Sequence, residues 1–152
     1  MQLEQRVLAC ALQVPHLVAD EFDALPEQAF GVPAHRAVRD AIAAAGGAAE
    51  APAGPEWVER VLEHTEGGVA GLVGSLAVAD LPVSDDAELD RWAVSVVAAL
   101  TAQAVTRAVA DLRRRLQRLD PVADAEAHAA AFAELMAMEV KRRAARERAL
   151  GA

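Results

Sequence analysis

The side chains that most often carry catalysis or bind metals are few in this chain, and their spacing is not that of a site. The histidines lie far apart, without the H-x-x-x-H spacing that binds zinc on a helix: His16, His35, His64 and His128. We expect each at a surface or a helix end. Cys10 is the only cysteine, which excludes an internal disulfide or a zinc ribbon, and its apolar surroundings predict a buried, inert thiol.

Motifs for phosphate binding and nucleophilic catalysis are also missing. Lys141 is the only lysine and does not lie in G-K-[ST], so there is no P-loop. No serine lies in G-x-S-x-G, and the acids lack the paired context of acid–base catalysis. Four glycines lack the G-x-G-x-x-G pattern and predict a helix start and close helix packing: Gly67, Gly68, Gly71 and Gly74. We therefore expect no catalytic residue, metal site or cofactor in this chain.

Charge is distributed unevenly along the sequence. Residues 107–152 have a net charge of +3 and residues 1–106 of −11, which together give −8. Ten of the fifteen basic residues lie in the C-terminal segment: Arg107, Arg113, Arg114, Arg115, Arg118, Lys141, Arg142, Arg143, Arg146 and Arg148. This asymmetry suggests two parts, of which the second contacts a partner. The overall negative charge argues against general nucleic-acid binding by the whole chain.

The composition favours an all-α protein. Hydrophobic residues make up 54% of the chain and aromatic residues only 3%, and alanine, the best helix former, is abundant. The longest apolar run, 69–79, is too short to cross a membrane, which takes about 20 residues. Periodicity, prolines and glycines predict five short helices and two long ones: 2–13, 15–24, 33–45, 55–64, 69–79, 86–119 and 121–149. A flexible loop is expected at 48–55.

The two long helices are predicted to form a C-terminal hairpin. Asp120 and Pro121 read as a capping residue and a first helical residue, and so short a turn gives an antiparallel pair. The long helix outruns the bundle, so its C-terminal half is expected to project. We therefore divide the chain into a helical bundle, 1–106, and a hairpin, 107–152. The inner stripe of the last helix is predicted to be Ala129, Phe132, Met136 and Val140.

Two interpretations of the basic hairpin remain open. Its arginines could simply solvate the helices and pair with acids at helical spacing. Alternatively they could border a protein-binding surface, because Arg113, Arg114 and Arg115 surround the helix and the hairpin is rich in large apolar residues. These are Leu116, Leu119, Phe132, Leu135, Met136 and Met138, more than a pair of helices can hide.

The order of several segments resembles the C-terminal domain of bacterial DNA primase. VPHLVADEFDALPEQAFGVPAHRAVRDAIAAAGG (14–47) is similar to the start of that domain, and SLAVADLP (75–82) to the segment before its long helix. RRRLQRLDPVAD (113–124) and FAELMAMEVKRRAARERAL (132–150) resemble its terminal hairpin. The similarity runs essentially from end to end.

This resemblance implies a non-catalytic docking module of the bacterial cytoplasm that binds the N-terminal collar of the hexameric replicative helicase and brings primase to the replication fork. The zinc and magnesium of the parent enzyme would belong to other domains. The expected contacts are Arg113, Arg114, Leu116, Arg118, Leu119, Met136, Glu139, Arg142, Arg143 and Arg146. In some members the domain also binds the acidic tail of single-stranded DNA-binding protein, for which the candidates are Arg36, Arg39, Arg107 and Lys141.

Three other functions are weighed against docking. The N-terminal domain of the replicative helicase has a related helical shape. A dimerising all-α regulator or scaffold would share this composition, and its hairpin would bind a second copy of itself. An enzyme acting on a small molecule would need a pocket with convergent polar groups, which the sequence does not indicate.

Overall fold

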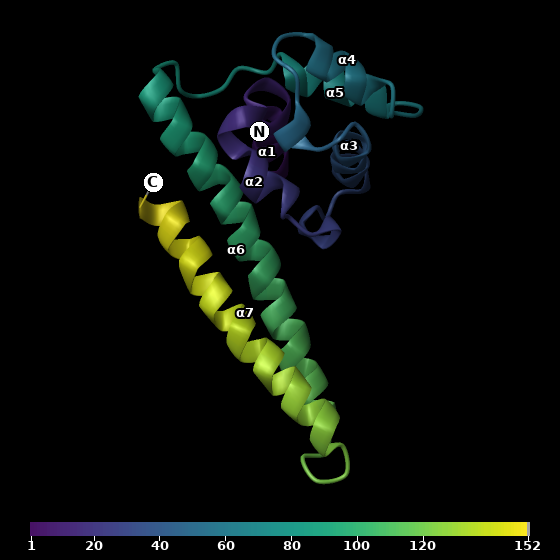
Figure 1. The fold of residues 1–152 in the computed structure, drawn as a ribbon, viewed down its shortest axis with the longest axis vertical. Helices are drawn as coiled ribbons and strands as arrows, with labels where there is room; N and C mark the ends of the chain where they lie inside the picture. The colour runs from purple at the N-terminus through teal and green to yellow at the C-terminus, as the bar shows by residue number, and fades with distance from the viewer. Residues whose placement is uncertain (152) are drawn as a thin grey trace.

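The protein is all-α, as predicted. The structure, a computed structural model, describes residues 1–151, which contain seven α-helices, two short 3-10 helices and no strand. Five short α-helices form a bundle, and the two long helices form an antiparallel hairpin beside it (Figure 1). The elements are α1 Leu3–Gln13, α2 Pro15–Asp23, η1 Glu27–Ala29, α3 Pro33–Ala44, η2 Ala48–Glu50, α4 Glu56–Leu62, α5 Val69–Ala77, α6 Asp86–Arg118 and α7 Ala125–Gly151.

The centre of the bundle is α1, whose residues Val7 to Leu12 are all buried. Around it the other short helices contribute Phe22, Ile42 and Val73, and α6 adds Leu100. Cys10 is buried in this core, as predicted, and burial raises the pKa of its thiol to about 12. The thiol is therefore protonated and unreactive at neutral pH.

The segment after α3 is more regular than the predicted flexible loop at 48–55. It begins with η2, whose first two backbone N–H groups, those of Ala48 and Ala49, donate to the Asp23 carboxylate at 2.8 and 3.0 Å. Gly47 makes this approach possible, because its φ is +85° and a Cβ there would lie 3.0 Å from a carboxylate oxygen of Asp23. A capping acid 25 residues away in the sequence thus orders the start of the loop.

The long helix α6 connects the bundle to the hairpin. The Asp85 carboxylate caps its start by accepting from the N–H groups of Ala87 and Glu88 at 3.0 and 3.1 Å. By length and composition alone α6 could cross a membrane, contrary to the expectation that no apolar segment is long enough. Half of that apolar stretch is buried, and α6 packs against α1, α2 and α7. This burial is that of a core helix.

The turn between α6 and α7 differs from the prediction. Pro121 is not the first residue of α7, because residues 121–124 form a separate turn and α7 begins at Ala125. The Asp120 carboxylate holds this turn by accepting from the N–H groups of Val122 and Ala123 at 2.7 and 3.0 Å. These two bonds lower the pKa of Asp120. The Asp124 carboxylate accepts in turn from the Asp120 N–H, so two acids close the hairpin.

The predicted inner stripe of α7 is wrong. Phe132, Met136 and Val140 are 50%, 46% and 67% exposed, and Ala129 is exposed as well. The residues buried against α6 are instead Ala131, Leu135 and Ala145. Since each residue advances a helix by about 100°, α7 is turned far from the predicted orientation. Both sides of α7 are apolar, and its seam with α6 uses the side rich in small residues, which allows the two helices a close approach.

The glycines around α5 also differ from the prediction of close helix packing. A Cβ built at Gly68, Gly71 or Gly74 would meet no heavy atom within 4 Å. These glycines therefore face open space. Among these four glycines, Gly67 is the one whose backbone favours glycine, because its φ of +58° is rarely adopted by other residues.

Candidate protein-binding site

The hairpin has a hydrophobic core of its own. The bundle's buried residues extend along α6 as far as Ala104, and a second cluster begins one residue later. This second cluster contains Val105, Val109 and Leu112 of α6 and Leu135 of α7. The turn end of the hairpin extends well beyond the bundle, as predicted (Figure 1). The hairpin thus projects from the bundle and has its own core. The division of the chain at residue 106 stays a prediction.

Three of the predicted contact residues bind one another across the hairpin. The two carboxylate oxygens of Glu139 accept from Arg113 of α6 at 2.7 Å and from Arg142 of α7 at 2.6 Å. Arg114 pairs with Asp111 one turn earlier, and Arg115 lies 3.9 Å from Glu134 across the seam. Exposed pairs of this kind contribute about 0–1 kcal/mol each. Arg113 and Arg115 therefore pair across the seam between α6 and α7, whereas Arg114 pairs within α6.

The other predicted contacts do not share one face. Leu116 and Leu119 are half-buried at the end of α6, where Leu116 packs on the hairpin core. Arg118, Arg143 and Arg146 are exposed. Met136 lies on the side of α7 that faces away from α6, together with two residues that sequence reasoning had placed inside, Phe132 and Val140. A helix with two apolar faces was the signal that could have identified this surface.

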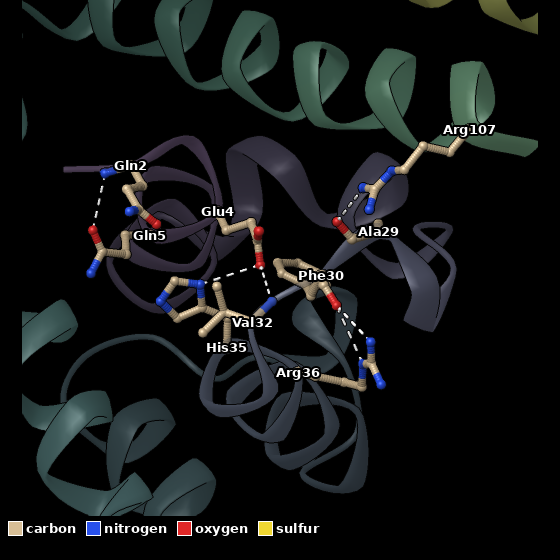
Figure 2. Close-up of polar contacts among 9 residues, drawn as sticks. All are labelled: Gln2, Glu4, Gln5, Ala29, Phe30, Val32, His35, Arg36 and Arg107. Atoms are coloured by element: carbon tan, nitrogen blue, oxygen red, sulfur yellow. Dashed lines mark hydrogen bonds and ion pairs between the residues drawn. The ribbon is translucent and has the colours of Figure 1, made fainter.

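The arginines predicted to bind an acidic peptide are gathered around the turn at residues 25–30, but their donors are partly engaged there. Arg36 donates to the Phe30 carbonyl at 3.0 Å, and Arg107 of α6 donates to the Ala29 carbonyl at 3.1 Å (Figure 2). Arg39 donates to the Leu25 carbonyl at 3.4 Å. These three side chains attach the turn to α3 and α6. Lys141 of α7 lines a pocket together with Ala24 and Pro26, beside this turn.

His35 is buried rather than on the surface, although it does lie in the first turn of α3 as a helix-end residue. Its Nδ1 is 3.2 Å from a carboxylate oxygen of Glu4, which also accepts from the Val32 N–H at 3.3 Å (Figure 2). The histidine is 5% exposed. Glu4 joins α1 to the start of α3, a structural pairing that separation by 31 residues hid from the sequence.

A pocket of about 340 Å³ lies where α7 returns to the bundle. Its walls are mostly apolar and include Ala104, Val105 and Met138, with Lys141 and Arg148 among the residues that line it. Arg148 also binds Glu21 of α2 at 3.1 Å and so connects the end of the hairpin to the bundle. Within residues 1–150, no three His, Cys, Asp or Glu side chains are grouped so that they could hold a metal ion.

Comparison with known proteins identifies relatives along nearly the whole chain. Residues 4–131 match the family model described as DNA primase DnaG DnaB-binding. The DNA primase of Mycolicibacterium smegmatis is 38% identical over 149 residues, which are 97% of this chain and 23% of that protein. The DNA primase of Streptomyces coelicolor is 33% identical over 140 residues, 90% of this chain and 22% of that protein. The chain thus spans less than a quarter of the length of these relatives.

A solved structure shows the same architecture. The helicase binding domain of primase from Mycobacterium tuberculosis superposes with a TM-score of 0.85 at 35% sequence identity, over 98% of this chain and 92% of that one. Bundle and hairpin are therefore both shared with that domain.

Proposed function

This chain belongs to the DnaB-binding family of the bacterial DNA primase DnaG, and from that membership we propose that it docks on the replicative DNA helicase and recruits primase to the replication fork. The region is a non-catalytic part of primase, and primer synthesis belongs to the remainder of the parent protein. We place this activity in the bacterial cytoplasm. The N-terminal collar of the helicase hexamer is the proposed docking site.

The observation that carries the proposal is the projecting hairpin. It has its own core and leaves large apolar side chains exposed, on a fold shared with a domain known as helicase binding. Tethering converts the search of primase for template into a nearly intramolecular event, at effective concentrations that reach the millimolar range. A moderate, reversible interface suits an enzyme that is needed intermittently.

Removing the hairpin is expected to abolish helicase binding. The full chain and a version ending at Thr106 would each be mixed with the replicative helicase hexamer of the same organism and analysed by size exclusion. The shorter version retains every buried residue of the bundle core, which ends at Ala104, and circular dichroism checks that it is folded. Co-elution of the full chain alone supports the proposal. If neither version co-elutes, or if the full chain elutes as a dimer, docking on helicase is contradicted.

We propose a second partner, the acidic tail of single-stranded DNA-binding protein, for the pocket between α2, α6 and α7. Its apolar walls and Lys141 suit a peptide with apolar and acidic side chains, whereas Arg148 is already paired with Glu21, which lines the pocket together with Asp20. Of the four residues predicted to bind this tail, Lys141 lines the pocket. Arg36, Arg39 and Arg107 do not line it, because their donors bind backbone carbonyls of the turn at residues 25–30.

Replacing Lys141 by glutamine is expected to weaken binding of an acidic peptide by up to roughly fivefold, because an exposed charge contributes at most about 1 kcal/mol. Fluorescence anisotropy with a labelled tail peptide measures the affinity, and raising the salt concentration should weaken it further. Arg118→Gln, at the far end of α6, is the matched loss of one positive charge. Equal affinities for the Lys141 variant and the unaltered chain would count against this pocket.

A further inference from the structure

The side of α7 that faces away from α6 is apolar and uncharged over about three turns, from Ala129 to Val140. It presents Ala129, Phe132, Ala133, Met136 and Val140, all exposed. We infer that this outer face of α7 is the surface that enters the partner, and that the partner offers an uncharged apolar groove between helices. The inference rests on the proposed function, because the partner meant is the replicative helicase.

The spacing of the large residues is that of a helix made to lie in a groove. Phe132, Met136 and Val140 follow one another at four-residue intervals, which places them on one stripe about 12 Å long. They are among the most exposed large hydrophobic residues in the structure. Single exposed apolar residues are ordinary, but a contiguous row with phenylalanine and methionine is typical of an interface.

The charges of α7 indicate which kind of partner fits. Glu139 and Arg142 are engaged at the seam, Glu134 lies near Arg115 of α6, and the outer face has no charged residue between Glu126 in the first turn of α7 and Arg143. A neutral face gains most from a neutral groove, because a charge buried opposite it would lose its water without compensation. Arg113, Arg115 and Arg142 are engaged at the seam rather than on the outer face, so contact through that face is apolar.

A second copy of the chain is a poorer occupant. Each copy has a formal net charge of −8, so two copies repel one another at long range. The family to which the chain belongs is defined by binding to a different protein. A groove on the helicase, which is a different protein, is consistent with both the net charge of the chain and the family description.

The test uses the full chain with Phe132→Gln, Met136→Gln and Val140→Gln combined. Glutamine favours helix about as well as methionine, and all three positions are exposed, so α7 is expected to stay folded. The control is Val78→Gln, the same kind of substitution at an exposed apolar residue outside the hairpin. Isothermal titration against the helicase hexamer is expected to show binding at least about 100-fold weaker for the triple variant and within about threefold of the unaltered chain for the control.

Three results are informative. Triple-variant binding equal to that of the unaltered chain overturns the outer-face inference while docking itself stands. Affinity that falls steeply with salt also overturns it, since the contact would then be electrostatic, whereas a weak salt dependence with a negative heat-capacity change supports it. If the unaltered chain does not bind helicase at all, the proposed function fails first, and sedimentation showing a dimer that the triple variant loses would assign the face to a second copy.

Discussion

Replacing Trp57 by alanine is expected to destabilise the protein by about 3–5 kcal/mol, the cost of removing a fully buried large aromatic side chain. Trp57 of α4 is 1% exposed and packs against the centre of the bundle. Its indole Nε1–H also donates to the Ala11 carbonyl of α1 at 2.9 Å. That carbonyl has no partner within its own helix, because the residue four positions later is Pro15, which lacks an N–H.

Trp57→Phe separates the contribution of the buried ring from that of the hydrogen bond to the Ala11 carbonyl. Phenylalanine fills much of the space but leaves the buried Ala11 carbonyl unpaired, at a cost of about 1–3 kcal/mol. Urea unfolding monitored by circular dichroism at constant m-value measures both variants. Val78→Ala, at a position 79% exposed, is the control and should change stability by less than about 0.5 kcal/mol. A Trp57→Ala protein as stable as the Val78 control would show that α4 is not required for the bundle core.

The buried residues were predictable in helices that have clearly separated apolar and polar positions. In α6, apolar residues at helical spacing are buried in both halves, Val96 and Leu100 in the bundle core and Val109 and Leu112 in the hairpin core. Prolines and paired glycines placed the ends of the short helices to within a few residues. The same reasoning failed for α7, since its alanine- and leucine-rich face and its Phe132-containing face have the same periodicity. Only the packing against α6 distinguishes them.

Contacts between residues far apart in sequence account for the other differences. The burial of His35 depends on Glu4, and the order of the loop after α3 depends on Asp23. Neither pairing has a local signal. The sequence indicates the hairpin as the candidate region but does not indicate which of its faces contacts a partner. Arg113, Glu139 and Arg142 have the composition of an interface, yet their geometry is that of a clamp between two helices. Whether any of the predicted residues contacts a partner stays a prediction.

Replacing Leu135 by alanine is expected to release α7 from α6 while the bundle stays folded. Leu135 is the one large α7 side chain buried in the hairpin core, which it shares with Val105, Val109 and Leu112, and its truncation should cost about 2–5 kcal/mol. The hairpin core shares no buried residue with the bundle core, so the loss should remain local. Hydrogen exchange should therefore accelerate in residues 125–150 and remain slow in α1.

Met136→Ala is the matched comparison for this variant, because it removes a side chain of similar size one position later on the exposed side. Its exchange rates should be close to those of the unaltered chain, yet it should weaken helicase binding directly, through the loss of contact on the outer face. Leu135→Ala should weaken binding as well, but only through the lost order of α7. Binding lost without faster exchange therefore assigns a residue to the interface, and binding lost with faster exchange assigns it to the seam. Fast exchange in the Met136 variant, or slow exchange in the Leu135 variant, would reverse the orientation of α7 on which the outer-face inference depends.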